Sequence, residues 1–128
     1  MGTGTEIGRV RGLGSAKAGA HHWWLQRLTA GGNLLLMLWF LFSLLRLPHY
    51  DYASVTAWLA SPLAAVPMIL LVISVFWHFR MGLQVVIEDY QHDETRVIAI
   101  VLLNFYTVAM AGLAIFAILK IAFTGGAA

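Results

Sequence analysis

Three long stretches without a formal charge constrain the fold of this 128-residue chain more than any other feature. They cover residues 28–45, 52–79 and 97–119. A membrane-spanning helix needs about 20 mostly apolar residues, and in lipid a segment must satisfy its backbone hydrogen bonds internally. The sequence therefore predicts an all-α membrane protein with three transmembrane helices, at about 28–46, 63–89 and 96–122. The second helix is expected to begin after Ser61-Pro62, because proline suits a first helical turn.

The composition excludes several classes of protein. Hydrophobic residues make up 60% of the chain and charged residues only 11%, which is typical of integral membrane proteins. The net charge of +2 is small and the basic residues are scattered, so we expect no nucleic-acid partner. The absence of cysteine excludes disulfides, thiolate catalysis and cysteine-ligated metals. Any metal must be held by histidine, carboxylate or backbone groups.

The basic residues near the helix ends predict an orientation. Those on the first side, which also includes the connection at residues 88–96, are Arg9, Arg11, Lys17, Arg27 and Arg96. The opposite side has only Arg46 and Lys120. Because cytoplasmic loops are enriched in lysine and arginine, we expect a cytoplasmic N-terminus and a periplasmic C-terminus. The predicted organisation is an N-terminal cytoplasmic segment, 1–27, followed by one three-helix transmembrane domain, 28–123.

An ionisable residue, His78, lies inside the second predicted helix, in the stretch WHFRMGLQVVIEDY at residues 77–90. Ionisable residues within a membrane are costly and usually face protein or a cavity. Three alternatives are open: a neutral histidine bonded to a neighbouring helix, a metal or haem ligand, or a proton carrier. Gly82, one turn later, either leaves room for a flat bulky group or is a helix-packing contact. Arg80 lies about 200° around the helix from His78 and either extends toward the headgroups or pairs with an acid or propionate on another helix.

Two further groups of polar residues flank the apolar runs. Asp89 shares a helical face with His78, roughly 16 Å along the axis, and Tyr90 follows it. A tyrosine hydroxyl and a carboxylate at an interface suit a quinone headgroup; the alternative is a solvated loop in which Asp93 or Thr95 caps the third helix. Before the first run, His21 and Arg27 are candidates to bind either lipid phosphates or the propionates of a haem.

The stretch HFRMGLQVVIEDY, followed by QHDE, resembles the second transmembrane helix of the small hydrophobic anchor subunit of succinate dehydrogenase (succinate:quinone oxidoreductase, complex II). The matching positions are His78, Gly82, Gln84-Val85, Asp89 and Tyr90. Three helices, a cytoplasmic N-terminus and this length are also typical of that family. The companion cytochrome b subunit carries a Ser-Pro-His stretch that is absent here, which favours the smaller anchor. Arg80 departs from the family pattern, because some relatives have an aromatic residue or histidine there.

The resemblance implies a set of roles. His78 would be one axial ligand of a haem b, with Gly82 packing beside it and the second axial histidine supplied by the cytochrome b subunit. Tyr90 would hydrogen-bond ubiquinone, with Asp89 close by. Arg27 and His21 would lie near the haem propionates. The chain would itself hold no flavin, since the flavoprotein and iron–sulfur subunits would complete the enzyme.

The resemblance also implies a bacterial inner-membrane location among lipids, in preference to the mitochondrial inner membrane. Its function would be to couple succinate oxidation to the respiratory chain by helping to reduce ubiquinone. Two alternatives stay open at this point. One is a structural anchor without haem, and the other is the membrane anchor of a fumarate reductase.

Overall fold

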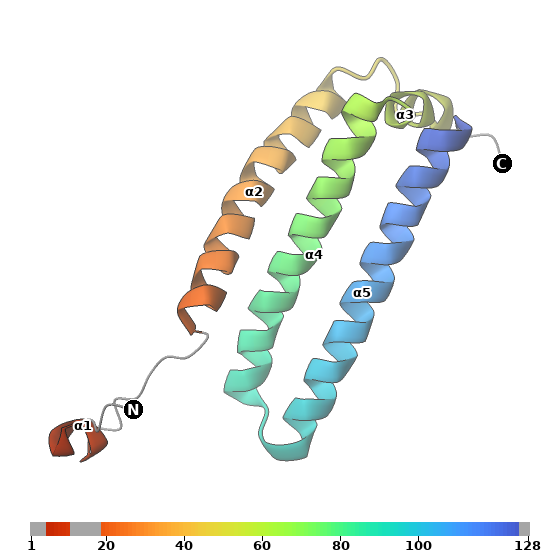
Figure 1. Ribbon diagram of the computed structural model, residues 1–128. Coiled ribbons are helices and arrows are strands. Elements are labelled where there is room, and N and C mark those ends of the chain that lie inside the picture. Colours follow the sequence, from red (N-terminus) through yellow and green to blue (C-terminus); the bar gives the residue numbers. More distant parts are fainter. Residues whose placement is uncertain (1–4, 11–18, 126–128) are drawn as a thin grey trace.

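The computed structural model describes residues 5–10 and 19–125, and these residues form helices joined by short connections (Figure 1). In chain order the helices are α1 (Glu6–Val10), α2 (Gly19–Leu45), α3 (Tyr52–Leu59), α4 (Pro62–Tyr90) and α5 (Asp93–Thr124). Three of them, α2, α4 and α5, are long and apolar enough to cross a membrane. This confirms the prediction of an all-α chain with three candidate membrane spans. The short helix α1 contacts none of the other helices.

The helix α4 is the centre of the arrangement. It packs against α2 on one side and α5 on the other, whereas α2 and α5 do not contact each other. The three long helices therefore lie in a row with α4 in the middle (Figure 1). Consecutive long helices run antiparallel, so the start of α2 lies at the same end of the row as the connection between α4 and α5.

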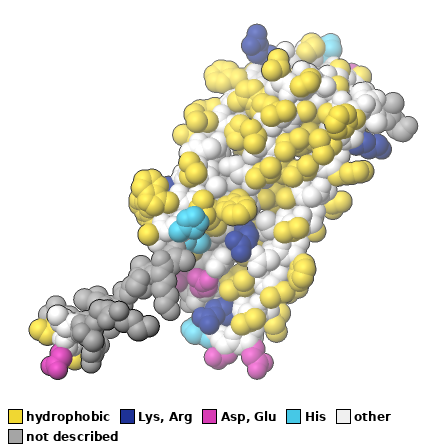
Figure 2. Space-filling view, viewed as in Figure 1, with side chains coloured by type: hydrophobic (Ala, Val, Ile, Leu, Met, Phe, Trp, Pro, Cys, Tyr) yellow, Lys and Arg dark blue, Asp and Glu magenta, His cyan; other side chains and the backbone are white. Residues whose placement is uncertain are grey.

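Little of the surface of these helices is buried within the chain. No residue of α2 is buried, and one cluster of buried residues, Leu59, Ala65 and Ile118, lies where α3, α4 and α5 meet. Apolar side chains cover most of the visible face of the long helices, and charged side chains gather toward the two ends (Figure 2). In a lipid bilayer an apolar exterior of this kind is in its preferred solvent.

Local signals explain where several helices begin and end. Ser61 is the N-cap of α4 and Pro62 its first residue, one residue before the expected start at about 63. Gly125 ends α5 in the left-handed conformation, with φ of 62°. Only Gln91 and His92 separate α4 from α5, and Asp93 follows with φ of 53°, a conformation that aspartate tolerates better than most residues.

Three features differ from the sequence-based expectation. The first long helix begins at Gly19 rather than near residue 28, because the polar and aromatic residues before the apolar run continue the same helix. The short helix α3 was not expected; Asp51 caps it by accepting a hydrogen bond from the backbone N–H of Ser54 at 2.9 Å. The N-cap of α5 is His92 rather than Asp93 or Thr95, and the Thr95 hydroxyl instead donates to the His92 carbonyl at 2.7 Å.

Candidate functional site

The imidazole of His78 lies between α4 and α2, where it meets the hydroxyl of Thr29. The His78 Nδ1 and the Thr29 Oγ1 are 3.1 Å apart, and both side chains are half-buried. The Thr29 hydroxyl also lies within hydrogen-bond distance of two carbonyls of its own helix, at 2.8 Å from Leu25 and 3.1 Å from Gln26. One ring nitrogen of His78 therefore contacts a neighbouring helix. This agrees with the alternative of a histidine that is hydrogen-bonded to another helix.

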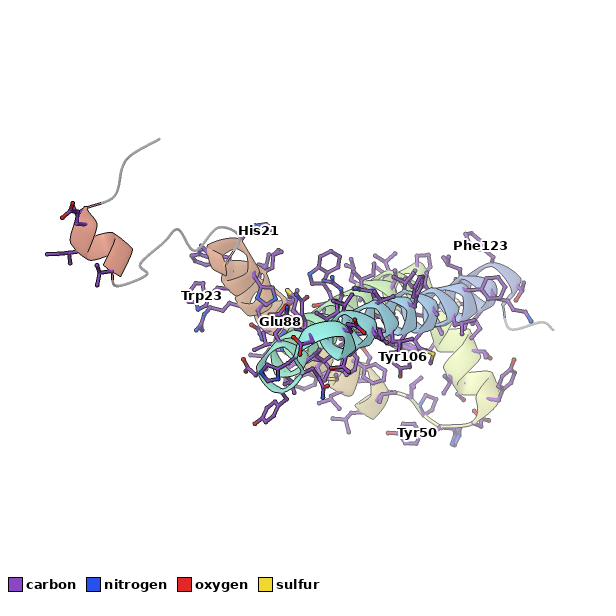
Figure 3. All side chains as sticks on the ribbon, turned by 90° about the horizontal axis from the view of Figure 1, so that it is seen from below. His21, Trp23, Tyr50, Glu88, Tyr106 and Phe123 are labelled. Carbon is purple, nitrogen blue, oxygen red and sulfur yellow. The ribbon has the colours of Figure 1, made fainter. Side chains whose placement is uncertain are left out.

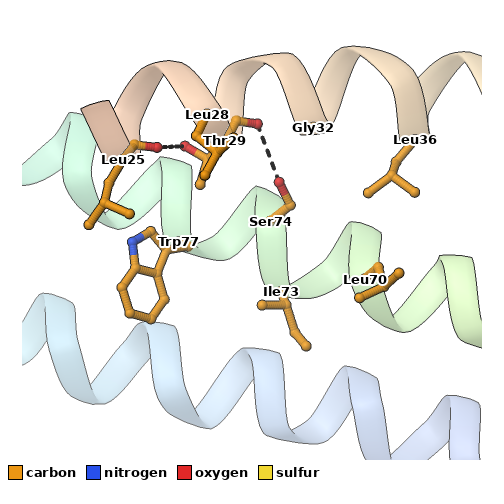
Figure 4. A pocket seen from close by; sticks show the side chains of 9 residues that line it. All are labelled: Leu25, Leu28, Thr29, Gly32, Leu36, Leu70, Ile73, Ser74 and Trp77. Carbon is orange, nitrogen blue, oxygen red and sulfur yellow. Dashed lines mark hydrogen bonds between the residues drawn. The ribbon is translucent and has the colours of Figure 1, made fainter. Parts of the chain in front are cut away.

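A second polar contact joins the same two helices one turn away. The Ser74 hydroxyl donates to the backbone carbonyl of Thr29 at 3.3 Å (Figure 4). Gly32 allows this approach, because a Cβ at that position would lie 3.3 Å from the Ser74 Oγ. Thr29 thus receives contacts from α4 at both its side chain and its carbonyl.

Beside these contacts lies an apolar groove of about 430 Å³ between α2 and α4 (Figure 4). Its lining includes Leu25, Leu28 and Leu36 from α2, and Leu70, Ile73 and Trp77 from α4. His78 does not line it. The groove offers an apolar surface to a lipid chain or to another apolar segment.

Gly82 differs from Gly32 in its surroundings. A Cβ built on Gly82 would meet no atom within 4 Å, although the residue is half-buried like His78. No described side chain or neighbouring helix backbone therefore lies against the position that a side chain at residue 82 would occupy. The space one turn after His78 is open.

Arg80 makes a contact that the sequence did not indicate. Its Nε donates to the Oδ1 of Asn104 on α5, and both residues are half-buried. The partner is a neutral amide on the neighbouring helix, rather than an acid or a propionate. Near this pair, Phe79 and Tyr106 pack with their ring centroids 6.3 Å apart at a second apolar groove, of about 450 Å³, between α4 and α5.

Asp89 and Tyr90 are the last two residues of α4 and both are exposed; Tyr90 is 77% exposed. They follow His78 by eleven and twelve residues along one continuous helix, which separates them from it by roughly 16–18 Å. Near them the Gln84 side-chain amide donates to Glu88 Oε1 at 2.8 Å. His78 and the Asp89–Tyr90 pair are thus two separate positions on one helix.

The first turns of α2 carry His21 and Arg27, and both side chains are exposed. The Arg27 guanidinium carbon lies 4.1 Å from the ring centroid of Trp23, a cation–π geometry. Trp23 lies on the side of α2 that faces away from α4 and α5 (Figure 3). Arg27 is two residues, or about 200°, from Thr29. The structure thus brings neither Arg27 nor His21 into contact with His78.

Within the described part of the chain, no group of three or more histidine, cysteine or acidic residues is arranged to hold a metal ion. Among these residues His78 is therefore not part of a metal-binding cluster.

The structure adds four polar residues to which the sequence assigned no role: Thr29, Ser74, Asn104 and Asn33. Each is a polar residue within an otherwise apolar run, and this isolation is the sequence feature that could have indicated a role for it. The first three pair between helices. The buried Oδ1 of Asn33 has no hydrogen-bond partner among the residues that the structure describes.

Comparison with known proteins gives consistent results. The family model described as "Succinate dehydrogenase/Fumarate reductase transmembrane subunit" matches residues 1–121. A succinate dehydrogenase hydrophobic membrane anchor subunit from Rickettsia bellii (strain RML369-C) is 36% identical over 115 residues, which are 87% of this chain and 92% of that protein. The corresponding subunit of Paracoccus denitrificans is 28% identical over 111 residues, 87% of this chain and 86% of its own.

A succinate dehydrogenase membrane anchor subunit from Reclinomonas americana is 34% identical over 92 residues, 69% of this chain and 77% of that protein. No solved structure matches the chain significantly.

Proposed function

The chain belongs to the succinate dehydrogenase/fumarate reductase transmembrane subunit family, and on that premise we propose that it helps to hold a haem b and to bind a quinone. The chain is a multi-pass membrane anchor subunit of that enzyme and is itself non-catalytic. In the proposal, His78 is one axial ligand of the haem and a cytochrome b subunit supplies the other. The Rickettsia and Paracoccus relatives support the anchor role, because their names describe hydrophobic membrane anchors.

The observation that carries the haem proposal is the contrast between the two sides of His78. One ring nitrogen is engaged by Thr29, which leaves the other available, and the next turn of the helix at Gly82 is open. An imidazole nitrogen beside an uncovered glycine fits a flat macrocycle. A haem held by His78 would supply one-electron redox chemistry. In the proposal the group is shared with a second chain, and the absence of a metal-binding cluster among the described residues is consistent with that.

Tyr90 and Asp89 carry the quinone part of the proposal. Both are exposed at the end of α4, where a headgroup can reach them from the membrane surface. The Tyr90 hydroxyl donates a hydrogen bond to a quinone carbonyl and so stabilises the negative charge that develops on its oxygen during reduction. The Asp89 carboxylate passes protons between water and the bound headgroup.

We place His21 and Arg27 on the same side of the membrane as Tyr90, near the haem propionates. Both are exposed in the first turns of α2, and the positive charge of Arg27 suits a carboxylate. In this arrangement the N-terminal segment and the α4–α5 connection are cytoplasmic, and the C-terminus is periplasmic. The flavoprotein and iron–sulfur subunits then bind at the cytoplasmic side of a bacterial inner membrane, and electrons from succinate pass to ubiquinone.

The haem proposal is tested by the absorption spectrum of the purified complex. The wild-type complex should show a b-type spectrum that is lost or strongly altered in His78→Ala. His49→Ala is the matched control, because His49 is exposed in the connection between α2 and α3. A b-type spectrum that persists unchanged in His78→Ala contradicts shared ligation. A wild-type complex without haem supports the alternative of a purely structural anchor.

The quinone proposal is tested by two activities of one preparation. Tyr90→Phe should slow quinone reduction while succinate-dependent reduction of an artificial dye at the flavin survives. Tyr50→Phe serves as the control, since Tyr50 is exposed at the opposite end of the helices. Unchanged quinone kinetics in Tyr90→Phe would remove that residue from the site. Direct comparison of succinate oxidation with fumarate reduction then distinguishes a succinate dehydrogenase from a fumarate reductase.

A further inference from the structure

The contact between Thr29 and His78 indicates which of the two ring nitrogens of His78 carries the hydrogen. The Thr29 hydroxyl has one hydrogen to donate, and the Leu25 carbonyl lies 2.8 Å from its oxygen, closer than the His78 Nδ1 at 3.1 Å. A threonine hydroxyl in a helix commonly donates to the carbonyl four residues before it. With its hydrogen used in this way, the Thr29 oxygen is left as an acceptor. His78 Nδ1 must then be the donor, so the hydrogen of the neutral ring lies on Nδ1.

A neutral imidazole with its hydrogen on Nδ1 has its lone pair on Nε2. That is the nitrogen through which a histidine can bind iron while its other nitrogen is held by the protein. We propose that Thr29 is a positioning residue for His78: its hydroxyl oxygen fixes the Nδ1–H tautomer and the orientation of the ring, and thereby presents Nε2 as the axial ligand. This proposal rests on the proposed haem function, and it adds a residue that the sequence resemblance did not indicate.

The backbone around Thr29 is held in a way that supports this role. Ser74 lies one turn before His78 on α4 and donates to the Thr29 carbonyl at 3.3 Å. Gly32, one turn after Thr29, allows the two helices to approach there. Two hydrogen bonds from one face of α4 therefore meet at a single residue of α2. This fixes the register of the two helices, and the position of the Thr29 oxygen relative to the His78 ring follows from it.

The first test does not require haem. The full-length chain with ¹⁵N-labelled histidine is placed in haem-free lipid bilayers, and the signal that disappears in His78→Gln identifies His78. Nitrogen chemical shifts distinguish the protonated from the unprotonated ring nitrogen. We expect Nδ1 to be protonated in the wild-type chain and in Thr29→Ser, and a shift toward Nε2–H in Thr29→Val. A wild-type ring protonated on Nε2, or the same tautomer in Thr29→Val, overturns the proposal.

The second test uses the complete complex. Metal-ligand histidines that lose the acceptor of their second nitrogen typically bind the metal 10–100-fold more weakly, so Thr29→Val should lower haem affinity by roughly that factor. The midpoint potential of the remaining haem should rise, because loss of the acceptor makes the imidazole a poorer electron donor. Thr29→Ser should restore both quantities. Unchanged haem affinity and potential in Thr29→Val overturn the proposal.

Thr107→Val is the matched control for both tests. Thr107 is a buried threonine on α5 whose hydroxyl donates to the carbonyl four residues earlier, at 2.8 Å from Leu103 O. It has the same local geometry as Thr29 without the histidine. A loss of haem in Thr107→Val equal to that in Thr29→Val would show a general packing effect and overturn the positioning role. A wild-type complex without haem refutes the proposed haem function alone, while the tautomer measurement still decides the hydrogen bond.

Discussion

The Nε of Arg80 donates a hydrogen bond to the Oδ1 of Asn104, and this bond links α4 to α5 within their apolar spans. A charged side chain is thereby held by a neutral amide of the neighbouring helix. The cost of placing a guanidinium in this environment is reduced by the bond, because the alternative in hydrocarbon is a donor with no acceptor. Arg80 is therefore part of the contact between two helices, in addition to any role in the assembled complex.

We expect a double-mutant cycle to detect this bond. Asn104→Leu removes the acceptor and leaves the arginine, Arg80→Met removes the charge, and the double variant removes both. Interhelical hydrogen bonds in membranes average about 0.6 kcal/mol and reach about 1.7 kcal/mol, so the two changes should couple by about 1 kcal/mol. The measurement is the unfolding free energy of the complex in detergent. Strictly additive effects would show that the pair contributes nothing to stability.

The close approach at Gly32 predicts different tolerance at two adjacent glycines. Gly32→Val should destabilise the contact between α2 and α4 by about 1–3 kcal/mol, the usual cost of overpacking, because even a Cβ there lies 3.3 Å from Ser74 Oγ. Gly31→Val should hardly change the stability of this contact, since a Cβ at Gly31 meets nothing within 4 Å. Thermal unfolding of the two variants compares them directly. Equal destabilisation of both would argue against a close approach of α2 and α4 at Gly32.

Asp51 gives a pH-dependent prediction outside the membrane spans. A side-chain hydrogen bond from Ser54, together with the Ser54 backbone N–H, lowers the pKa of Asp51 below its ordinary value. The folded pKa is the lower one, so the stabilisation is complete at neutral pH and is lost as the pH falls through that lowered value. The protection factors of the α3 amides, which correct for the intrinsic pH dependence of exchange, should therefore fall at acid pH in the wild-type chain, and should be below the wild-type values at neutral pH in Asp51→Ala. An Asp51→Ala profile that matches wild type at neutral pH would exclude a capping role.

Trp58 is expected to hold α3 against the end of α2. Its ring lies 6.0 Å from that of Trp39, stacked at 27°, and 6.3 Å from that of Phe40. Aromatic pairs contribute about 0.5–1.5 kcal/mol beyond the area they bury. Trp58→Ala should accordingly increase hydrogen exchange throughout α3, whereas Trp58→Phe should retain part of the protection. Full protection of α3 in Trp58→Ala would show that its contacts with α4 and α5 suffice.

The sequence predicted features that depend on local composition. The uncharged runs predicted the three long helices, and Ser61-Pro62 predicted the start of α4, because both signals act within one segment. The start of α2 at Gly19 was missed. The residues between Gly19 and Leu28 are largely polar and aromatic, so no apolar run marks them as part of the helix. The helix α3 was missed because its eight residues, which lie between two spans, are too few to show a clear helical periodicity.

The polar contacts of the site could not be predicted for another reason. His78 stood out as an ionisable residue, but Thr29 is 49 positions away and becomes its neighbour only through the register of α2 on α4. The same holds for Arg80 and Asn104, which are 24 positions apart on different helices. Rotation and sliding of packed helices decide such pairs, and a single sequence does not encode either quantity locally. The roles of His78, Asp89 and Tyr90 in haem and quinone binding stay predictions.

The row of three long helices, in which α2 and α5 each contact α4 and not each other, has a consequence for biogenesis. Each long helix packs against the long helix that precedes or follows it in the chain. As translation proceeds, α4 can pack against α2 when α2 is already in the bilayer, and α5 can then pack against α4. No span has to wait for a distant segment of its own polypeptide, so the order of synthesis is also a workable order of membrane insertion and packing.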